Sequence, residues 1–302
     1  MSAGNDAVRV MEVGPRDGLQ NEKALLPPAV KIELVERLGA CGLPAIEVTS
    51  FVSPRWIPQL ADADQVLGAI CRRPGVDYPV LVPNLQGYER ARAAGADSIA
   101  AFTAASEAFS QRNTNASIAQ TLERFAPVIA QARADGVRVR GYVSTVLGCP
   151  YQGEVAVAEV VRVATALHQL GCVEISLGDT IGVGTPAKAR AMLRAVASQI
   201  PMAQLAVHFH DTYGQALANV LACLEEGVRT VDAAVAGSGG CPYAAGASGN
   251  LASEDLVYLL HGLGLHTGID LPALAATGQW LSQQLGQANR SRAGSALTSR
   301  PT

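Results

Sequence analysis

A regular alternation of short apolar runs and longer helix-like segments is the feature that most constrains the fold of this 302-residue chain. The short runs are rich in β-branched residues, as strands are. Eight such runs can be identified: Val8–Val13, Ala45–Phe51, Tyr78–Val82, Ser98–Thr103, Val137–Ser144, Val173–Leu177, Leu205–His208 and Thr230–Val235. Because strands that alternate with helices form parallel sheets, this order predicts an α/β fold.

Helix signals lie between the predicted strands. The clearest helical segments are Ala29–Ala40, Ser117–Ala134, Val155–Leu170, Pro186–Ile200 and Tyr213–Glu226. Glycine, the usual residue just past a helix C-terminus, ends several helical stretches, at Gly42, Gly95, Gly136, Gly171 and Gly227. The pattern therefore predicts helices that carry the chain from each strand to the next.

Eight strand–helix units over this length favour a closed (β/α)8 TIM barrel. The first strand is not followed by G-x-G-x-x-G, which disfavours a dinucleotide-binding fold. No Pro/Ser-rich linker divides the chain. We therefore expect a single catalytic domain over residues 1–302, with the barrel at about 8–268, a Gly-rich active-site loop, and a C-terminal helix and tail at 269–302.

Charge and composition exclude several classes of partner. The formal net charge is −3 and no Lys/Arg block is present, so a nucleic-acid surface is not expected. No apolar run approaches the roughly 20 residues that cross a bilayer. The N-terminal string MSAGNDAVRV lacks a basic or Arg-rich leader, so a cytoplasmic location is expected. The six cysteines form no C-x-x-C pair, which argues against a structural zinc site or a disulfide scaffold.

Polar side chains collect where the predicted strands end. They are Arg16, Asp17, Glu47, Ser50, Asn84, Tyr142, Ser144, Ser176, Asp179, His208 and His210. In a TIM barrel the carboxyl ends of all the strands meet at one face, where active sites form. We therefore expect these side chains to surround one site, with Ser50, Tyr142, Ser176, Asp179 and the adjacent Thr180 as candidate substrate contacts.

The string VHFHDTYG predicts a metal site. His208 and His210 are two residues apart, so on a strand both imidazoles point to the same side. Asp17 would add a hard anionic ligand, and this set without thiolates suits Mg²⁺ or Mn²⁺ better than zinc or ferrous iron. The alternative is a pair of hydrogen-bonded core histidines. Asn250 could add an amide oxygen, or simply cap the helix that follows.

Two further residues suggest chemistry at this face. Arg16, beside the candidate ligand Asp17, could bind a carbonyl or enolate oxygen, and it could equally pair with Glu47 or Asp179. Cys241 lies in a segment with five glycines between Gly237 and Gly249, a composition typical of movable lids. A thiol there could serve as an acid or base, or be a chance cysteine in a loop.

Eight strings along the chain resemble the 3-hydroxy-3-methylglutaryl-CoA lyase family. They are EVGPRDGLQNEK, SFVSPRWIPQ, PNLQGYERA, AASEAFSQRN, RGYVSTVLGCPYQG, EISLGDTIGVGTP, VHFHDTYGQALAN and GGCPYAAGASGNLASEDLVYLLHGLGLHTG. They cover nearly all of the chain from Val8 to about Gly268. An R-D-G-x-Q string alone would indicate only the wider superfamily of metal-dependent barrels.

The resemblance implies a divalent cation, Mg²⁺ or Mn²⁺, and cleavage of (S)-3-hydroxy-3-methylglutaryl-CoA to acetyl-CoA and acetoacetate. It implies a cation held by Asp17, His208, His210 and Asn250, and a catalytic set of Arg16, Cys241, His208 and Glu47, with Asp17 or His208 as the base. It also implies a homodimer and makes Asn113 and Lys23 candidate contacts for coenzyme A. Thr145 stands where relatives often have cysteine, so no disulfide can form from that position.

Four other functions remain open on the sequence alone. A sister lyase for a longer branched substrate, such as 3-hydroxy-3-isohexenylglutaryl-CoA, would share the catalytic centre. A Claisen-type synthase is disfavoured by the strings GPRDGLQ and CPY. An iron oxygenase with two histidines and one carboxylate would need an oxygen-binding site. A non-catalytic metal-binding barrel would leave Arg16 and Cys241 without a role.

Overall fold

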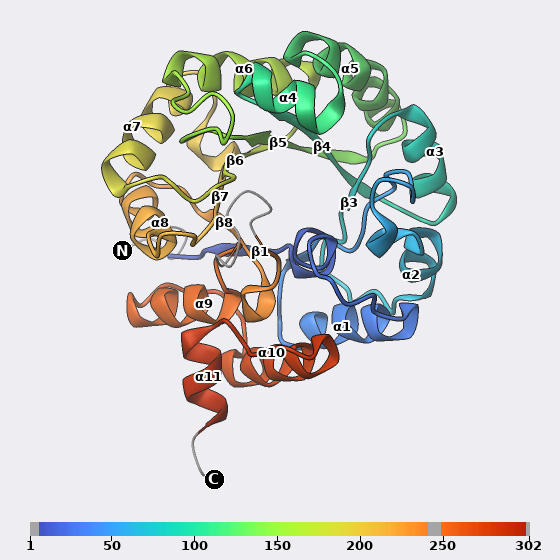
Figure 1. The fold of residues 1–302 in the computed structure, drawn as a ribbon, viewed down its shortest axis with the longest axis vertical. Coiled ribbons are helices and arrows are strands. Elements are labelled where there is room, and N and C mark those ends of the chain that lie inside the picture. The colour runs from blue at the N-terminus through green and yellow to red at the C-terminus, as the bar shows by residue number, and fades with distance from the viewer. Residues whose placement is uncertain (1–5, 241–248, 300–302) are drawn as a thin grey trace.

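The computed structural model describes residues 6–240 and 249–299 and places eight parallel strands in a ring with helices outside it (Figure 1). The strands are β1 (Arg9–Glu12), β2 (Ala45–Ile46), β3 (Val80–Leu81), β4 (Ser98–Ala104), β5 (Arg138–Ser144), β6 (Glu174–Asp179), β7 (Leu205–Phe209) and β8 (Thr230–Ala233). All eight lie at the predicted positions, so the predicted TIM-barrel fold is confirmed.

The order of the strands shows how the ring closes. The sheet runs β2-β1-β8-β7-β6-β5-β4-β3, so the first strand pairs with the eighth. Between the two ends of this series, Val48 N donates to Pro79 O at 3.0 Å and Phe51 N donates to Leu81 O at 2.8 Å. β2 and β3 are short because Pro79 has no N–H to donate, which interrupts the ladder between them.

Helices follow the strands and pack around the ring. They are α1 (Pro28–Ala40), α2 (Ala63–Ala69), α3 (Leu85–Ala93), α4 (Glu107–Thr114), α5 (Ile118–Ala134), α6 (Val157–Leu170), α7 (Pro186–Ala197), α8 (Ala216–Glu225), α9 (Ser253–Gly262), α10 (Leu271–Leu285) and α11 (Arg292–Thr298). Short helical turns η1 (Gly14–Gly18), η2 (Pro58–Leu60), η3 (Met202–Gln204) and η4 (Val235–Gly237) lie between them. No helix in the described part of the chain is both long and apolar enough to span a bilayer.

The predicted helices agree with α1, α5, α6, α7 and α8 to within a few residues. The single helix expected in the tail is instead two helices, because Gly286 adopts a left-handed conformation with φ of 66° and ends α10. Short, polar helices such as α4 have no long apolar stripe, so their sequences gave a weak signal.

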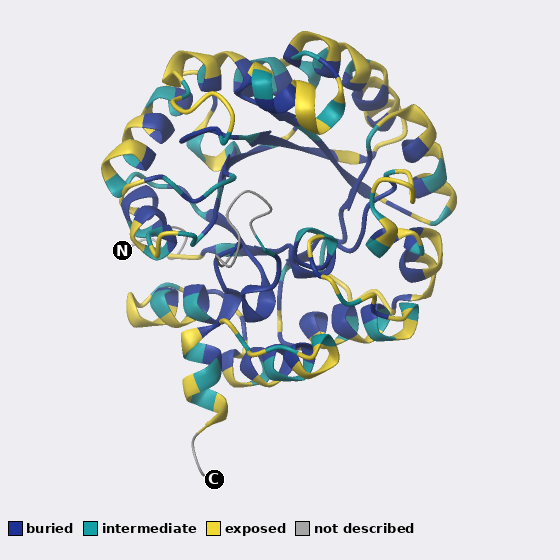
Figure 2. Ribbon diagram, in the orientation of Figure 1, coloured by how far each residue is buried: buried dark blue, intermediate teal, exposed yellow. Residues whose placement is uncertain are grey.

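Side chains along a strand point alternately outward, to the apolar core between strands and helices, and inward, to the space inside the barrel. Val139 and Val143 of β5 belong to the large apolar core between strands and helices, where the buried faces of the helices lie (Figure 2). Between them, Arg140 and Tyr142 point into the ring, where Arg140 binds carboxylates of other strands. The space inside the ring is therefore polar, in contrast with the usual apolar filling of small barrels.

Glu12, at the end of β1, joins its own strand end to two distant segments of the chain. Its buried carboxyl accepts hydrogen bonds from Gly14 N and Val235 N, both at 2.8 Å, and from the Ser253 hydroxyl. Burial raises the pKa of Glu12 to about 7, more than these hydrogen bonds lower it. The carboxyl is therefore mostly protonated in the folded protein at mildly acidic pH.

This shift predicts a loss of stability as the pH rises. The folded state holds the Glu12 proton more tightly than the unfolded state, whose pKa is near 4.5. The protonated Glu12 carboxyl stabilises the folded state fully below pH 4.5. This stabilisation, of up to roughly 3 kcal/mol, is lost as the pH rises from 4.5 through 7. Urea unfolding at pH 5 and pH 8 should show a smaller pH dependence for Glu12→Gln than for the parent protein. Equal dependence in the two proteins would contradict this assignment.

Candidate active site at the carboxyl ends of the strands

A cleft of about 490 Å³ opens at the carboxyl ends of the strands. Of the side chains predicted to surround a site, it is lined by Arg16, Asp17, Asn113, Tyr142, Ser144, Thr180, His208 and His210. They come from η1, α4, β5, the segment after β6, and the end of β7. Segments far apart in sequence thus contribute to one wall.

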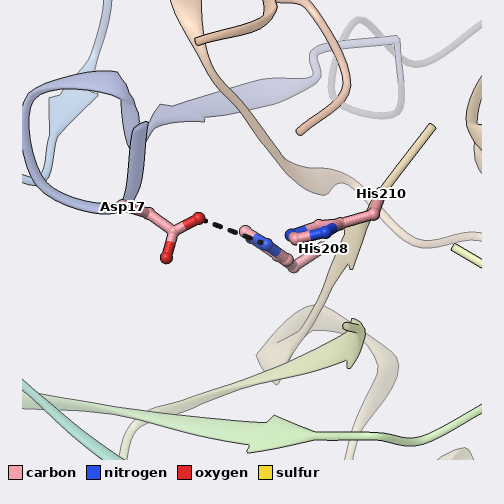
Figure 3. A group of neighbouring side chains, drawn as sticks. All are labelled: Asp17, His208 and His210. Atoms are coloured by element: carbon pink, nitrogen blue, oxygen red, sulfur yellow. Dashed lines mark ion pairs between the residues drawn. The ribbon is translucent and has the colours of Figure 1, made fainter. Parts of the chain in front are cut away.

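Asp17, His208 and His210 form a group that could hold a metal ion. One ligand atom from each lies within 4.8 Å of the others, and the three side chains converge in the same space (Figure 3). The Nε2 atom of His208 lies 4.0 Å from Oδ2 of Asp17. These distances leave room for a small cation between the three groups, so the predicted ligand set does converge.

The local chain conformation explains how Asp17 reaches the histidines. After β1 the chain turns into η1, a π-helix in which Val13 O accepts from Asp17 N at 2.7 Å. A Cβ on Gly18 would lie 2.4 Å from Ser238 Oγ, so only glycine permits this turn to pack against the end of the barrel. His208 lies within β7 and His210 just beyond it, where alternation places both on the inner side.

Asn250 lies beside the group of candidate ligands. Its Nδ2 atom donates to Asp17 Oδ2 at 2.9 Å and to Ser238 O at 3.2 Å, and its backbone forms a bridge with His210. Rotation of the amide by half a turn exchanges its oxygen and nitrogen. Asn250 therefore lies where it could supply an oxygen ligand, and in this structure its amide orients Asp17.

Arg16 is held between two carboxylates at the bottom of the cleft. Its Nε donates to Glu47 Oε2 at 2.7 Å and its Nη1 to Asp17 Oδ1 at 2.6 Å. The guanidinium carbon also lies 5.5 Å from the centre of the Tyr142 ring. Burial would lower the pKa of Arg16, but Glu47 and Asp17 raise it above its usual value, so the cation is permanent.

Electrostatics prepare Asp17 and His210 to accept a cation. For His208, burial would lower the pKa, but Asp232 and Asp17 raise it. Burial would raise the pKa of Asp17, but Arg16 and both imidazoles lower it to about 2. Burial and the neighbouring His208 lower the pKa of His210 to about 4. An ionised carboxylate and a neutral imidazole are the forms that bind metal ions.

The other candidate substrate contacts differ in position. Thr180 lines the cleft, and its hydroxyl accepts from Thr145 N at 2.8 Å. Asp179 is buried, and its carboxylate accepts from the backbone of its own loop, with Gly184 N at 2.7 Å. Ser50 is fully buried and accepts from Val52 N at 3.2 Å. Asp179 and Ser50 are thus engaged in holding the chain and do not line the cleft.

Cys241 lies outside the described residues, so its position is not part of this geometry. The residues that precede it are firmly held. Gly239 N donates to Glu22 Oε1 at 2.9 Å, and Arg290, from the segment between α10 and α11, donates to Gly239 O at 2.9 Å. The C-terminal segment thus contacts the chain close to the Gly-rich stretch.

Two charged residues next to the site, Arg140 and Asp232, are not among the residues predicted from the sequence. Arg140 donates to both carboxylate oxygens of Asp232, at 2.9 and 2.7 Å. Ser176, predicted to contact substrate, instead donates to Asp232 Oδ2 at 2.9 Å. A charged residue in the middle of an apolar strand is unusual, and this signal could have identified both.

Known proteins resemble this chain along almost its whole length. The family model described as HMGL-like matches residues 7–281. The mitochondrial hydroxymethylglutaryl-CoA lyase of Gallus gallus is 57% identical over 285 residues, which cover 94% of this chain and 96% of that protein. The 3-hydroxy-3-isohexenylglutaryl-CoA/hydroxymethylglutaryl-CoA lyase of Pseudomonas aeruginosa is 58% identical over 290 residues, which cover 96% of this chain and 97% of that protein.

Solved structures agree with these sequence matches. A crystal structure of hydroxymethylglutaryl-CoA lyase from Pseudomonas aeruginosa superimposes with a TM-score of 0.96 at 57% identity, and the match covers 98% of this chain and 99% of that one. The chain that places Arg16 beside Asp17, His208 and His210 is therefore similar along nearly its whole length to hydroxymethylglutaryl-CoA lyases. The chain belongs to the HMGL-like family, that of the hydroxymethylglutaryl-CoA lyases.

Proposed function

We propose that this chain cleaves (S)-3-hydroxy-3-methylglutaryl-CoA to acetyl-CoA and acetoacetate, by retro-Claisen chemistry that depends on a divalent cation. The observation that carries the proposal is the position of Arg16. The guanidinium lines the same cleft as the Asp17, His208 and His210 group and is hydrogen-bonded to one of its members. A reaction in which one hydroxyl loses a proton while a neighbouring oxyanion forms needs these two kinds of group side by side.

The side chains present fit a hard divalent cation. Asp17, His208 and His210 would hold it, with Asn250 as a fourth ligand after rotation of its amide. The donor set contains oxygen and imidazole nitrogen and no described thiolate, which suits Mg²⁺ or Mn²⁺. When bound, such a cation would supply Lewis acidity that lowers the pKa of the substrate's tertiary hydroxyl.

The residues of the chain then divide the remaining work. Asp17 or His208 takes the hydroxyl proton as the carbon–carbon bond opens, the former hydroxyl carbon becoming the ketone of acetoacetate. The electrons of the broken bond form the enolate of the acetyl thioester. Arg16 stabilises the enolate oxygen, and Glu47 keeps the guanidinium in place through Nε. Such a preorganised donor commonly contributes about 3–4 kcal/mol.

We assign the last proton transfer to Cys241, which would protonate the enolate carbon and so release acetyl-CoA. The glycines around it would let the loop exclude water during the reaction. Tyr142, Asn113 and Thr180, which line the cleft, are proposed substrate contacts. Ser50, Ser176 and Asp179 were predicted to contact substrate, and we propose positioning roles for them instead, because their polar atoms bind neighbouring protein groups.

Removal of the cation tests the proposal directly. Protein treated with chelator is expected to release no acetoacetate from 3-hydroxy-3-methylglutaryl-CoA, and added Mg²⁺ or Mn²⁺ should restore release. The comparison of the two cations would also establish which one supports the faster reaction. Release that continues unchanged after complete removal of metal would reject the cation-dependent mechanism.

A longer branched acyl chain is a second candidate substrate. Part of the cleft wall is apolar and is formed by Val52, Leu81, Phe102, Phe109 and Phe125. This wall could accept an alkenyl group such as the one named for the Pseudomonas aeruginosa relative. The same assay with 3-hydroxy-3-isohexenylglutaryl-CoA would show cleavage if the apolar wall accepts that group, and none if the pocket is limited to methyl.

We further propose that the whole chain acts as one catalytic unit, that it forms a homodimer, and that it works in the cytoplasm. The dimer is supported by the resemblance to the lyase family and by the prevalence of two-fold symmetry among homo-oligomers. Light scattering of the purified protein would establish the number of subunits.

A further inference from the structure

We propose that Asp232, held by Arg140 and Ser176, is a positioning residue that fixes the orientation and tautomer of His208 so that Nε2 faces the cation. The proposal rests on the cation site assigned above. Asp232 itself does not belong to the group of Asp17, His208 and His210, whose ligand atoms all lie within 4.8 Å of one another. It would act only through the imidazole that it contacts.

Strand register places the two side chains together. His208 of β7 and Asp232 of β8 are direct partners in the parallel ladder, so both point into the ring at the same height. The Nδ1 atom of the His208 imidazole lies 3.3 Å from Oδ2 of Asp232. The other imidazole nitrogen, Nε2, faces Asp17 (Figure 3). The contact between His208 Nδ1 and Asp232 Oδ2 is within ion-pair distance, and a small tilt of the imidazole would align it as a hydrogen bond.

Asp232 is itself immobilised. Arg140 binds both of its oxygens, and the Ser176 hydroxyl donates to Oδ2, the same oxygen that faces His208. Only 1% of Asp232 is exposed, so solvent cannot replace these partners. Arg140 is in turn bound at Nε by Glu174 Oε1 at 2.6 Å. Glu174 is also paired with Arg9, which in turn contacts Asp77, near the end of the barrel opposite the cleft.

An ionised carboxylate can only accept hydrogen bonds, so it selects the form of His208 that carries hydrogen on Nδ1. The lone pair of that tautomer is on Nε2, which faces the other candidate ligands. A His208 that binds the cation in this form has no second lone pair to take the hydroxyl proton, so this proposal leaves Asp17 as the base. Neither Nδ1 atom makes a hydrogen bond within the described part of the chain. His208 Nδ1 nevertheless lies 3.3 Å from a carboxylate oxygen, whereas no described carboxylate lies within 4.0 Å of either nitrogen of His210. The site therefore contains one histidine with a supporting carboxylate and one without.

The proposal has a measurable consequence for cation affinity. Loss of the partner that orients a ligating histidine typically weakens metal binding 10–100-fold. Asp232→Asn keeps the shape of the side chain but removes the charge that selects the tautomer. We expect Mn²⁺, titrated alone and followed by electron paramagnetic resonance, to bind this variant about 10–100-fold more weakly than the parent protein.

A matched control separates positioning from general damage. Glu174→Gln alters the same buried ion network and the same Arg140 but does not touch His208. It should leave Mn²⁺ affinity within about twofold of the parent, well short of the loss expected for an orienting partner. Equal losses in both variants, or no loss in Asp232→Asn, would overturn the proposal.

Nitrogen NMR of the metal-free protein provides a readout independent of catalysis. The parent should show His208 with hydrogen on Nδ1, and Asp232→Asn should show a mixture of tautomers. An unchanged tautomer in the variant would also overturn the proposal. If Asp232→Asn does not fold because Arg140 is left unpaired, the double variant Arg140→Gln/Asp232→Asn removes both charges and carries the same expectations. A parent that shows this tautomer yet cleaves no substrate would instead reject the proposed function.

Discussion

Replacing Arg16 with glutamine is expected to lower kcat for acetoacetate release by about a thousandfold, the upper range for removal of one oxyanion donor. Glutamine keeps much of the length of the side chain but has no positive charge. Arg16 is buried and hydrogen-bonded to both Glu47 and Asp17. The neighbouring cation Arg140 is itself bound to Asp232 and Glu174, so it cannot replace Arg16 by a small movement. The loss should therefore appear in kcat and remain at saturating substrate.

Two further variants show whether the loss has the expected origin. Arg16→Lys retains the charge but lacks the fork that reaches both carboxylates, so its activity should fall between the parent and Arg16→Gln. Arg37→Gln, on the outer face of α1 where Arg37 pairs with Glu33, should leave the rate unchanged. Parent-like kcat in a folded Arg16→Gln protein would remove Arg16 from the mechanism.

Replacing His210 with alanine is expected to weaken Mn²⁺ binding by at least about a hundredfold, because loss of a supporting partner alone costs 10–100-fold and here a ligand itself is lost. Acetoacetate release at a fixed, low Mn²⁺ concentration should fall in parallel. His210 is 7% exposed at the inner side of the site, so water can replace its nitrogen only imperfectly. Calorimetric titration of the metal-free variant with Mn²⁺ measures the change.

His168→Ala is the matched control for this experiment. His168 lies on α6, and its Nε2 pairs with the Gln204 side chain at 2.9 Å, away from the cleft. Its removal should change neither cation affinity nor activity. If His210→Ala bound Mn²⁺ as tightly as the parent protein, His210 would have to be withdrawn from the ligand set.

The strands and the main helices were predictable because their signals are local. Apolar alternation, β-branched residues and terminal glycines all act within a few residues of chain, and each pointed to the same element. The shortening of β2 and β3 was not predicted, because it depends on Pro79 facing a particular partner strand. The π-helix at Gly14–Gly18 was also missed, since it depends on close packing against Ser238.

The sequence predicted which residues form the candidate cation site better than it predicted which hydrogen bonds join the surrounding residues. The spacing of His208 and His210 on a strand predicted a shared side, and the strand-end rule brought Asp17 to them. The sequence could not assign partners to Arg140 and Asp232, because the two residues are 92 positions apart and meet across the inside of the barrel, from strands β5 and β8 that are not neighbours in the sheet. For the same reason Ser176 was assigned to substrate although its hydroxyl binds Asp232.

The closure of the ring between β1 and β8 also determines when the site can exist during folding. Asp17 follows the first strand, and Asn250, 233 residues later, follows the eighth, yet the two side chains are hydrogen-bonded. Contacts of such long sequence separation form late, because the loop-closure entropy must be met before they add stability. We expect a nascent chain still lacking β8 to have no assembled cation site. The appearance of cation binding would then report the final step of folding, in which β8 pairs with β1.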